Sequence, residues 1–192
     1  MIPSAMNIVG DPKVPTSEIV VLGGIMFKEN IVVVGGSMFN KGIQGNGHLQ
    51  HLTLRQAKQC GVYGQSSFTM DDVLVEQCGL YGVVARGTGI GRCTNVEVRQ
   101  CGMSGVYAER GASITLIGAK TTVHHNCTRG MSDDYGLTVS GASATIQLVS
   151  PLTKEQVSLD NGGGGNWGAE RGEDGSGSDD EEGVDINQIK TI

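Results

Sequence analysis

Two acidic residues and two histidines lie close together in the chain and could do acid–base chemistry. The pair Asp133-Asp134 follows His124-His125 in the same stretch of sequence. Two carboxyl groups on either side of a glycosidic bond are the usual catalytic set of glycoside hydrolases. Neighbouring residues on a strand point to opposite faces, however, so Asp133 and Asp134 would need a turn to meet one substrate. Asp-Asp before Tyr-Gly is ordinary turn composition, and a solvated turn is the interpretation that we favour.

A second candidate site is a run of basic residues. Six Lys or Arg and two acidic residues lie between positions 86 and 129. Arg86 and Arg110 are each followed by Gly, as in equivalent turns, so we expect their guanidinium groups to form a short ladder that suits carboxylates or sulfates. The predicted anion- or glycan-binding residues are therefore Arg86, Arg110, His124 and Asp134. The simpler alternative is a set of solubilising surface charges.

Other signals of chemistry are weak. A metal site at His124-His125 would need further ligands, and Cys127 is expected to face the core, where a thiol is unreactive. The glycine-rich runs at 87–91 and 42–47 do not open a helix after a strand, as phosphate-binding loops do. We therefore assign no catalytic residue, no metal ligand and no cofactor, and we favour binding over enzymatic activity.

A repeat in the sequence predicts the secondary-structure elements that carry these residues. The phrase VLVEQCG begins at Val73 and VEVRQCG begins at Val96, and looser copies end at Cys60 and Cys127. Each unit of about 22 residues holds three short alternations of apolar and polar residues, which are typical of strands, and helical repeats are longer. The sequence predicts an all-β fold, a right-handed parallel β-helix (β-solenoid) with three strands per coil and about six or seven coils.

Stacked coils would place like residues above one another along an axis, because adjacent strands lie about 4.8 Å apart. Four thiols are expected in one file at a cramped corner: Cys60, Cys78, Cys101 and Cys127. An outward row would hold Glu76, Arg99 and His124. The Gly after the cysteine would take a positive φ or fill a crowded turn. Both ends of the stack would expose strand edges that need caps or partners.

The composition is that of one domain with a thin aliphatic core, since 31 of the 192 residues are Gly and only 4% are aromatic. The formal charge of −6 arises within residues 168–183, which contain seven acidic residues and one Arg. We divide the chain into a β-helix at 1–167, a flexible acidic Gly/Ser-rich loop at 168–183 and a C-terminal strand or cap at 184–192. Without a basic excess, nucleic acid is not an expected partner.

Neither export nor membrane insertion is indicated by the sequence. The start, MIPSAMNIVGDPK, lacks the basic and apolar regions of a signal peptide, and the apolar runs are far shorter than the roughly 20 residues that span a bilayer. An odd number of cysteines fits free thiols in a reducing compartment. We expect a soluble intracellular protein without a membrane partner.

Several stretches resemble a known group of repeat proteins. The run TTVHHNCTRG, then YGLTV, IQLVSPLTKEQVS, NGGGGNWG and INQIKTI, resembles uncharacterised right-handed parallel β-helix repeat proteins of eukaryotic microalgae and their large DNA viruses. The resemblance extends over nearly the whole chain, and it implies the fold and no activity. It also implies a virion or a host cytoplasm as the location. A more remote resemblance, of fold alone, is to pectate-lyase-like solenoids.

Two functions from different classes remain open. The first is a non-catalytic structural or protein-binding module that offers a rigid face or its coil ends to a protein partner within a larger assembly. The second is a carbohydrate-active protein, namely an acidic-polysaccharide lyase, an epimerase or a glycan binder that also uses Asp133 and Tyr107. The first is preferred because no acid–base set converges in the sequence. Convergence of the four predicted binding residues on one groove would favour the second, whereas their scatter over different faces would exclude a glycan site built from them.

Overall fold

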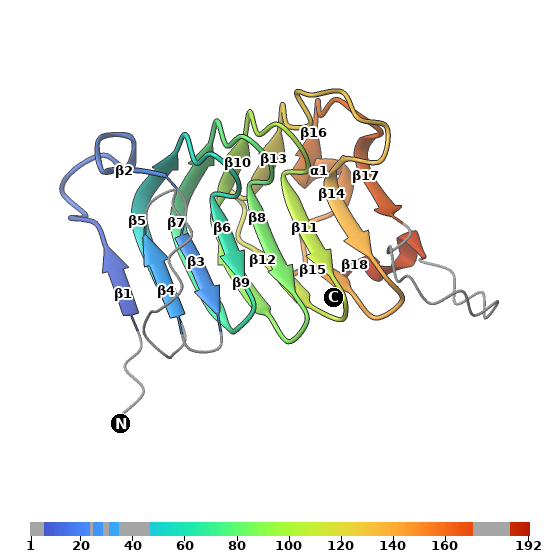
Figure 1. Ribbon diagram of the computed structural model, residues 1–192, viewed down its shortest axis with the longest axis horizontal. Helices are drawn as coiled ribbons and strands as arrows, with labels where there is room; N and C mark the ends of the chain where they lie inside the picture. The colour runs from blue at the N-terminus through green and yellow to red at the C-terminus, as the bar shows by residue number, and fades with distance from the viewer. Residues whose placement is uncertain (1–5, 24, 29–30, 35–46, 171–184) are drawn as a thin grey trace.

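The computed structural model describes residues 6–23, 25–28, 31–34, 47–170 and 185–192. Short strands lie side by side along the long axis of the molecule, from β1 at one end to β17 at the other (Figure 1). Of the predicted acidic loop at 168–183, residues 171–183 lie outside the described part of the chain.

The strands form two sheets, called sheet A and sheet B below. Sheet A has 11 strands: β1 (Met6–Val9), β2 (Val20–Leu22), β5 (Gly47–Arg55), β7 (Phe68–Glu76), β9 (Ile90–Thr94), β10 (Glu97–Arg99), β12 (Ser113–Ile117), β13 (Thr122–His124), β15 (Thr145–Leu148), β16 (Ser158–Leu159) and β18 (Ile189–Thr191). Sheet B has seven: β3 (Ile25–Lys28), β4 (Ile31–Val34), β6 (Val62–Gly64), β8 (Val83–Arg86), β11 (Val106–Glu109), β14 (Tyr135–Ser140) and β17 (Gly165–Glu170). The helices are short: η1 (Thr16–Glu18), α1 (Lys154–Val157) and η2 (Ile186–Gln188).

The predicted architecture of three strands per coil is wrong, although the all-β class is observed. The strands belong to two sheets of parallel strands rather than to three separate walls, and β3 and β4 pair antiparallel. Sheet A curls because the nine-residue strands β5 and β7 continue around a corner at His51 and Asp72, both at φ 53°. On either side of its bend β7 pairs with β9 and with β10, which joins two expected walls into one sheet.

Paired positions on successive strands form columns that run along the molecule. In sheet B one inward column is Val62, Val83, Val106, Leu137 and Trp167. All but the half-buried Trp167 are at most 1% exposed, and they form one aliphatic core with the inward residues of sheet A. Alternation of apolar and polar residues thus determines which side chains enter the core.

The predicted single file of four thiols is also wrong. Leu54, Val75, Val98 and Val123 are paired positions on neighbouring strands. The residues three positions further along each segment form the corner column, which contains Ala57, Cys78, Cys101 and Asn126. Cys60 and Cys127 fall in other columns because the segments around them differ in length from the regular units. Of these four thiols, only Cys78 and Cys101 share a column. An alignment of the repeat on its cysteines therefore places the first and last copies out of register.

The corner column is preceded by a column of residues in the left-handed backbone region: Gln56, Gln77, Gln100, His125 and Asp160, at φ between 51° and 58°. A positive φ was expected for the Gly after the cysteine. The residue before the cysteine takes that conformation instead. The glycines are needed for the crowded turn: a Cβ on Gly79 would lie 2.3 Å from the Lys58 carbonyl oxygen. Gln77 Nε2 donates to Gln100 Oε1 at 3.4 Å, which links successive turns.

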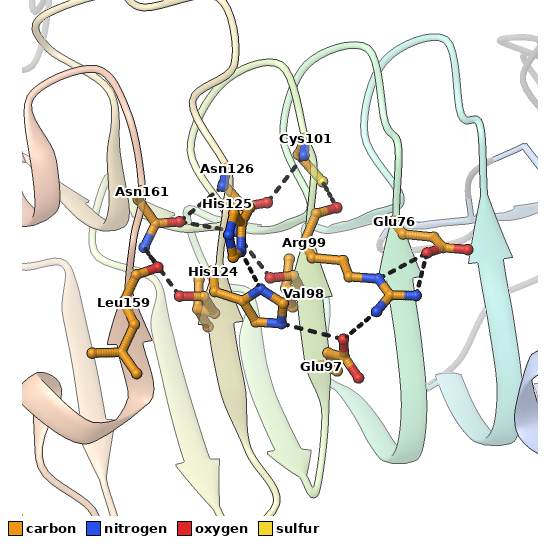
Figure 2. Close-up of polar contacts among 11 residues, drawn as sticks. Glu76, Glu97, Val98, Arg99, Cys101, His124, His125, Asn126, Leu159 and Asn161 are labelled. Carbon is orange, nitrogen blue, oxygen red and sulfur yellow. Dashed lines mark hydrogen bonds and ion pairs between the residues drawn. The ribbon is translucent and has the colours of Figure 1, made fainter.

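The expected outward row of charges is confirmed. Glu76 of β7 is 3% exposed and lies between Arg55 of β5 and Arg99 of β10, with N–O distances of 2.5 and 2.8 Å (Figure 2 shows the Arg99 side). Arg99 also contacts Glu97 at 2.8 Å, and His124 follows Arg99 in the same column. Burial opposes ionisation of Glu76, but hydrogen bonds from Arg99 and Arg55 outweigh it and lower the pKa of that carboxyl.

We expect Glu76→Gln to lower the free energy of unfolding by about 2–4 kcal/mol at neutral pH, because it leaves two arginines facing a neutral amide. A carboxyl with a lowered folded-state pKa stabilises the protein above its unfolded-state pKa of about 4.3 and ceases to do so as the pH falls through the folded value. Urea unfolding from pH 7 to pH 3 should therefore show a steeper acid loss for the wild type than for the variant.

The matched control is Glu97→Gln on the next strand, since Glu97 is 37% exposed and its ion pairs are screened by water. It should cost less than about 1 kcal/mol. Equal losses for the two variants would contradict the assignment of Glu76 as the centre of the charged column.

Candidate functional site

The two arginines that were expected to lie side by side are offset by one position. The register pairs Arg86 of β8 with Glu109 of β11, so that Gly87 is the neighbour of Arg110. Glu109 lies 3.4 Å from Arg86 and 3.8 Å from Arg110, measured from carboxylate oxygen to Nε. A carboxylate between the two guanidinium groups replaces the predicted basic ladder.

His124 lies in sheet A, whereas the two arginines belong to sheet B. Its Nε2 is 3.2 Å from Oε1 of Glu97, and its Nδ1 is 2.7 Å from Nδ1 of His125 (Figure 2). At that distance one of the two Nδ1 atoms donates a proton and the other accepts it. Both ring nitrogens of His124 are thus engaged by neighbours within sheet A.

Asp134 and its neighbour Asp133 lie in opposite environments. Asp133 is exposed, whereas Asp134 is 4% exposed and lies directly before β14. Its Oδ1 accepts a hydrogen bond from the Ser104 hydroxyl at 3.1 Å, and its Oδ2 has no hydrogen-bond partner among the described residues. Burial is the main cause that raises the pKa of Asp134, and the charge of Asp133 adds to it. A buried carboxylate oxygen without a partner is costly and therefore needs a functional or structural reason.

The structure brings together two of the four predicted binding residues. Arg86 and Arg110 meet at Glu109, at the C-terminal ends of β8 and β11. Asp134 precedes the N-terminal end of β14, which runs parallel to β11 and is its neighbour in sheet B. His124 lies on β13 in the other sheet. These residues therefore belong to three places rather than one groove.

A stacked pair of tyrosines lies on the outward face of sheet B. Tyr107 of β11 points outward because it alternates with the inward Val106 and Ala108. The ring of Tyr81, which precedes β8, stacks on Tyr107 with centroids 4.9 Å apart and an angle of 30° between the planes. Tyr81 is half-buried and Tyr107 is 8% exposed, so the outer ring covers the inner one.

A carboxylate contacts this tyrosine pair directly. The Tyr107 hydroxyl donates to Oε2 of Glu170 on β17 at 2.7 Å. Burial is the main cause that raises the pKa of Glu170, and the charges of Asp133, Asp134 and Glu109 add to it. We call the set Tyr81, Tyr107, Glu109, Asp134 and Glu170 the tyrosine–carboxylate cluster.

Burial also raises the pKa of the Tyr81 hydroxyl, and the charges of Asp134 and Glu170 reinforce the shift. The contacts within this set are the stack of Tyr81 on Tyr107 and the hydrogen bond from Tyr107 to Glu170. Negative charge is thereby concentrated around an aromatic pair, an arrangement that attracts cations.

Only part of this cluster could be recognised in the sequence: Tyr107 and Asp134 were candidates there, whereas Tyr81 and Glu170 were not. Alignment by strands would have helped, since Tyr81, Ser104 and Tyr135 occupy the same position, immediately before a glycine and an inward apolar residue. Glu170 had no such signal, because its strand lies beyond the last recognisable repeat.

Three of the five thiols are poorly suited to nucleophilic chemistry. All five cysteines lie in the described part of the chain and are free. Burial raises the pKa of Cys60 to about 11 and that of Cys93 and Cys127 to about 12. These thiols stay protonated at neutral pH, and a protonated thiol is a weak nucleophile and a poor metal ligand.

No three His, Cys, Asp or Glu side chains are arranged to hold a metal ion within the described ranges. In the same ranges, no helix has the length and apolar character needed to cross a bilayer.

Comparison of the chain with protein-family models, with curated proteins and with solved structures gave no match. The resemblance to repeat proteins of microalgae and their viruses therefore stays a prediction.

Proposed function

We propose that the protein is a non-catalytic binding module that holds a basic segment of a partner protein on the outward face of sheet B. The observation that carries the proposal is the stacked Tyr81–Tyr107 pair whose inner ring is hydrogen-bonded to Glu170. The charges of Asp134 and Glu109 act on the same groups. Aromatic faces attract ammonium and guanidinium groups, and carboxylates supply the opposite charge.

The electrostatics of the cluster support a cationic partner. Like charges contribute to the raised pKa of Asp134 and of Glu170, so each carboxylate is destabilised by its acidic neighbours. The charge of Arg129 opposes this at Asp134, and Arg86 is engaged with Glu109. A Lys or Arg side chain of a partner would relieve the repulsion, which is a source of binding energy and of specificity.

A carbohydrate-active protein is the second candidate, favoured by two carboxyl groups with raised pKa values near tyrosine rings. Such groups suit a general acid, and tyrosine faces suit the apolar faces of sugars. An acidic polysaccharide is the less suitable ligand, because Glu109 lies between the arginines that would bind it. A neutral glycan remains as the carbohydrate to test.

Calorimetric titration with four probes distinguishes these functions: a lysine-rich peptide, a glutamate-rich peptide of equal length, a neutral oligosaccharide and an oligogalacturonate. We expect the lysine-rich peptide alone to bind. Glu170→Gln and Tyr81→Ala should each weaken its binding at least about tenfold, since they remove the charge and the ring. Salt should weaken binding as well, because the attraction is screened.

Glu155→Gln is the matched control, since Glu155 is an exposed acid on α1 outside the cluster. It removes the same charge and should leave the affinity unchanged. Binding of the neutral oligosaccharide or the oligogalacturonate in place of the peptide would replace the proposal with a carbohydrate function. An equal loss in Glu155→Gln and Glu170→Gln would show nonspecific attraction to an acidic protein.

A further inference from the structure

The two ends of the molecule present open strand edges of the same polarity. Among the described residues, β1 and β2 pair only with β5, while β16 pairs only with β13 and β18 only with β15. All of these pairings are parallel. The far edges of β16 and β18 in one copy could therefore join the far edges of β2 and β1 in the next copy without any change of strand direction.

Exposed apolar side chains are concentrated at these ends. The described residues include seven exposed large apolar side chains: Val9, Leu22, Ile90, Met131, Leu159, Ile186 and Ile192. Five of the seven belong to the end elements β1, β2, β16 and η2 or to the residue after β18. Soluble proteins usually protect free edges with charges or proline rather than with exposed leucine and isoleucine.

The charged column of sheet A has an apolar residue at each end. Its interior members are Arg55, Glu76, Arg99 and His124, with Leu22 before them on β2 and Leu159 after them on β16. Leu22 is 66% exposed and Leu159 is 44% exposed. If the column continued into a second copy, Leu159 would lie beside Leu22 of that copy, and both side chains would be covered.

A second column of sheet A ends in the same way. This column begins at Val9 on β1 and passes through Gln50, Asp71 and Thr94. It ends at Ile192, the residue after Thr191, which pairs with Leu148. Val9 is 56% exposed and Ile192 is 55% exposed. Continuation into a second copy would bring these two side chains together, as it does the two leucines.

An inward column continues across the same junction. Ile8 of β1 stands at one end of the inward column that Thr191 of β18 completes at the other. A parallel pairing of β18 with β1 of a second copy therefore keeps core-facing positions beside core-facing positions. A shift by one residue would instead turn every side chain to the wrong face.

We infer that copies of this chain associate head to tail, the β16 and β18 edges of one copy pairing with the β2 and β1 edges of the next. The contact joins two different surfaces, so it does not close on itself and gives chains of copies. It uses the ends of sheet A, whereas the proposed partner-binding face lies on sheet B. The two proposals therefore stand or fall separately.

Two double variants with one end blocked test the inference. The first, Val9→Lys with Leu22→Lys, places charges at the β1/β2 end, and the second, Leu159→Lys with Ile192→Lys, places them at the β16/β18 end. Sedimentation velocity should show wild-type mass rising with concentration, while each variant alone stays a monomer. An equimolar mixture of the two variants should form dimers and nothing larger. The intact β16/β18 end of the first variant can pair with the intact β1/β2 end of the second, and the other two ends are blocked.

Ile90→Lys is the matched control, since Ile90 is 56% exposed and lies on β9, away from both ends. It should assemble as the wild type does. Circular dichroism would establish that all variants are folded. A wild-type protein that is monomeric at every concentration would overturn the inference. So would dimers of either blocked variant alone, which indicate a symmetric contact, or a monomeric Ile90→Lys.

Discussion

Gly82→Ala is expected to destabilise the protein by more than about 3 kcal/mol, the largest effect that we predict for the addition of a single methyl group. A Cβ at this position would lie 2.3 Å from Cγ1 of Val98 and 2.5 Å from the carbonyl oxygen of Gly105. The Gly105 oxygen cannot move away freely, because it accepts the hydrogen bond from the Val83 amide at 2.9 Å. Thermal or urea unfolding measures the loss.

Gly87→Ala in the same repeat unit separates crowding from backbone strain. Gly87 has a φ of +62°, but no heavy atom of another described residue, its two chain neighbours aside, lies within 4 Å of the position of its Cβ. Alanine there should cost about 1 kcal/mol, from the left-handed conformation alone. Similar losses at Gly82 and Gly87 would show that the narrow corner is not close-packed in solution.

Asn126→Ala should cost about 3–5 kcal/mol, because the Asn126 side chain satisfies buried backbone groups at the corner. Its Oδ1 accepts a hydrogen bond from the Cys101 amide at 3.1 Å, and its Nδ2 donates to the Val98 carbonyl at 2.9 Å. Nδ2 also lies 3.1 Å from Oδ1 of Asn161 in the next unit (Figure 2). Alanine leaves the amide and the carbonyl without partners and opens a cavity, and urea unfolding measures the resulting loss.

Asn126→Asp tests whether the donor is the essential part. A carboxylate still accepts from Cys101 but faces the Val98 carbonyl oxygen, so at neutral pH we expect a loss as large as that of alanine. Burial should raise the folded-state pKa of the new carboxyl above its unfolded value. The protonated form is then favoured by folding, so stability should be regained as the pH falls below the folded value.

Gln100→Ala is the control for Asn126, since Gln100 is exposed and its side chain meets only Gln77. It should cost no more than about 0.5 kcal/mol. If Gln100→Ala were as damaging as Asn126→Ala, the amides of the outer column rather than the corner column would hold the units together.

The repeat itself could be predicted from the sequence because local chemistry determines it. Alternating apolar residues such as Val96 and Val98 fix which side chains face inward, and the charged row through Glu76 and Arg99 followed from the same spacing. A glycine next to an inward valine was also visible at Gly82 and Gly105. These features depend on neighbours in sequence, which is why period-two patterns are informative.

The tertiary structure alone decided how the walls join and which residues share a column. Whether β7 ends at its corner or continues around it depends on the backbone of Asp72, which the alternation pattern does not report. Unequal loop lengths moved Cys60 and Cys127 out of the thiol column and placed Asn126 in it. A shift of one residue likewise paired Arg86 with Glu109 rather than with Arg110.

The same distinction applies to the candidate site. Tyr107 and Asp134 were visible as chemically capable residues, but their neighbours Tyr81 and Glu170 come from other units of the stack. Contacts between units depend on register, and register is set by the packing of whole strands against a common core. Local sequence therefore sets the composition of each unit, whereas the packing of whole strands sets which units and which side chains become neighbours.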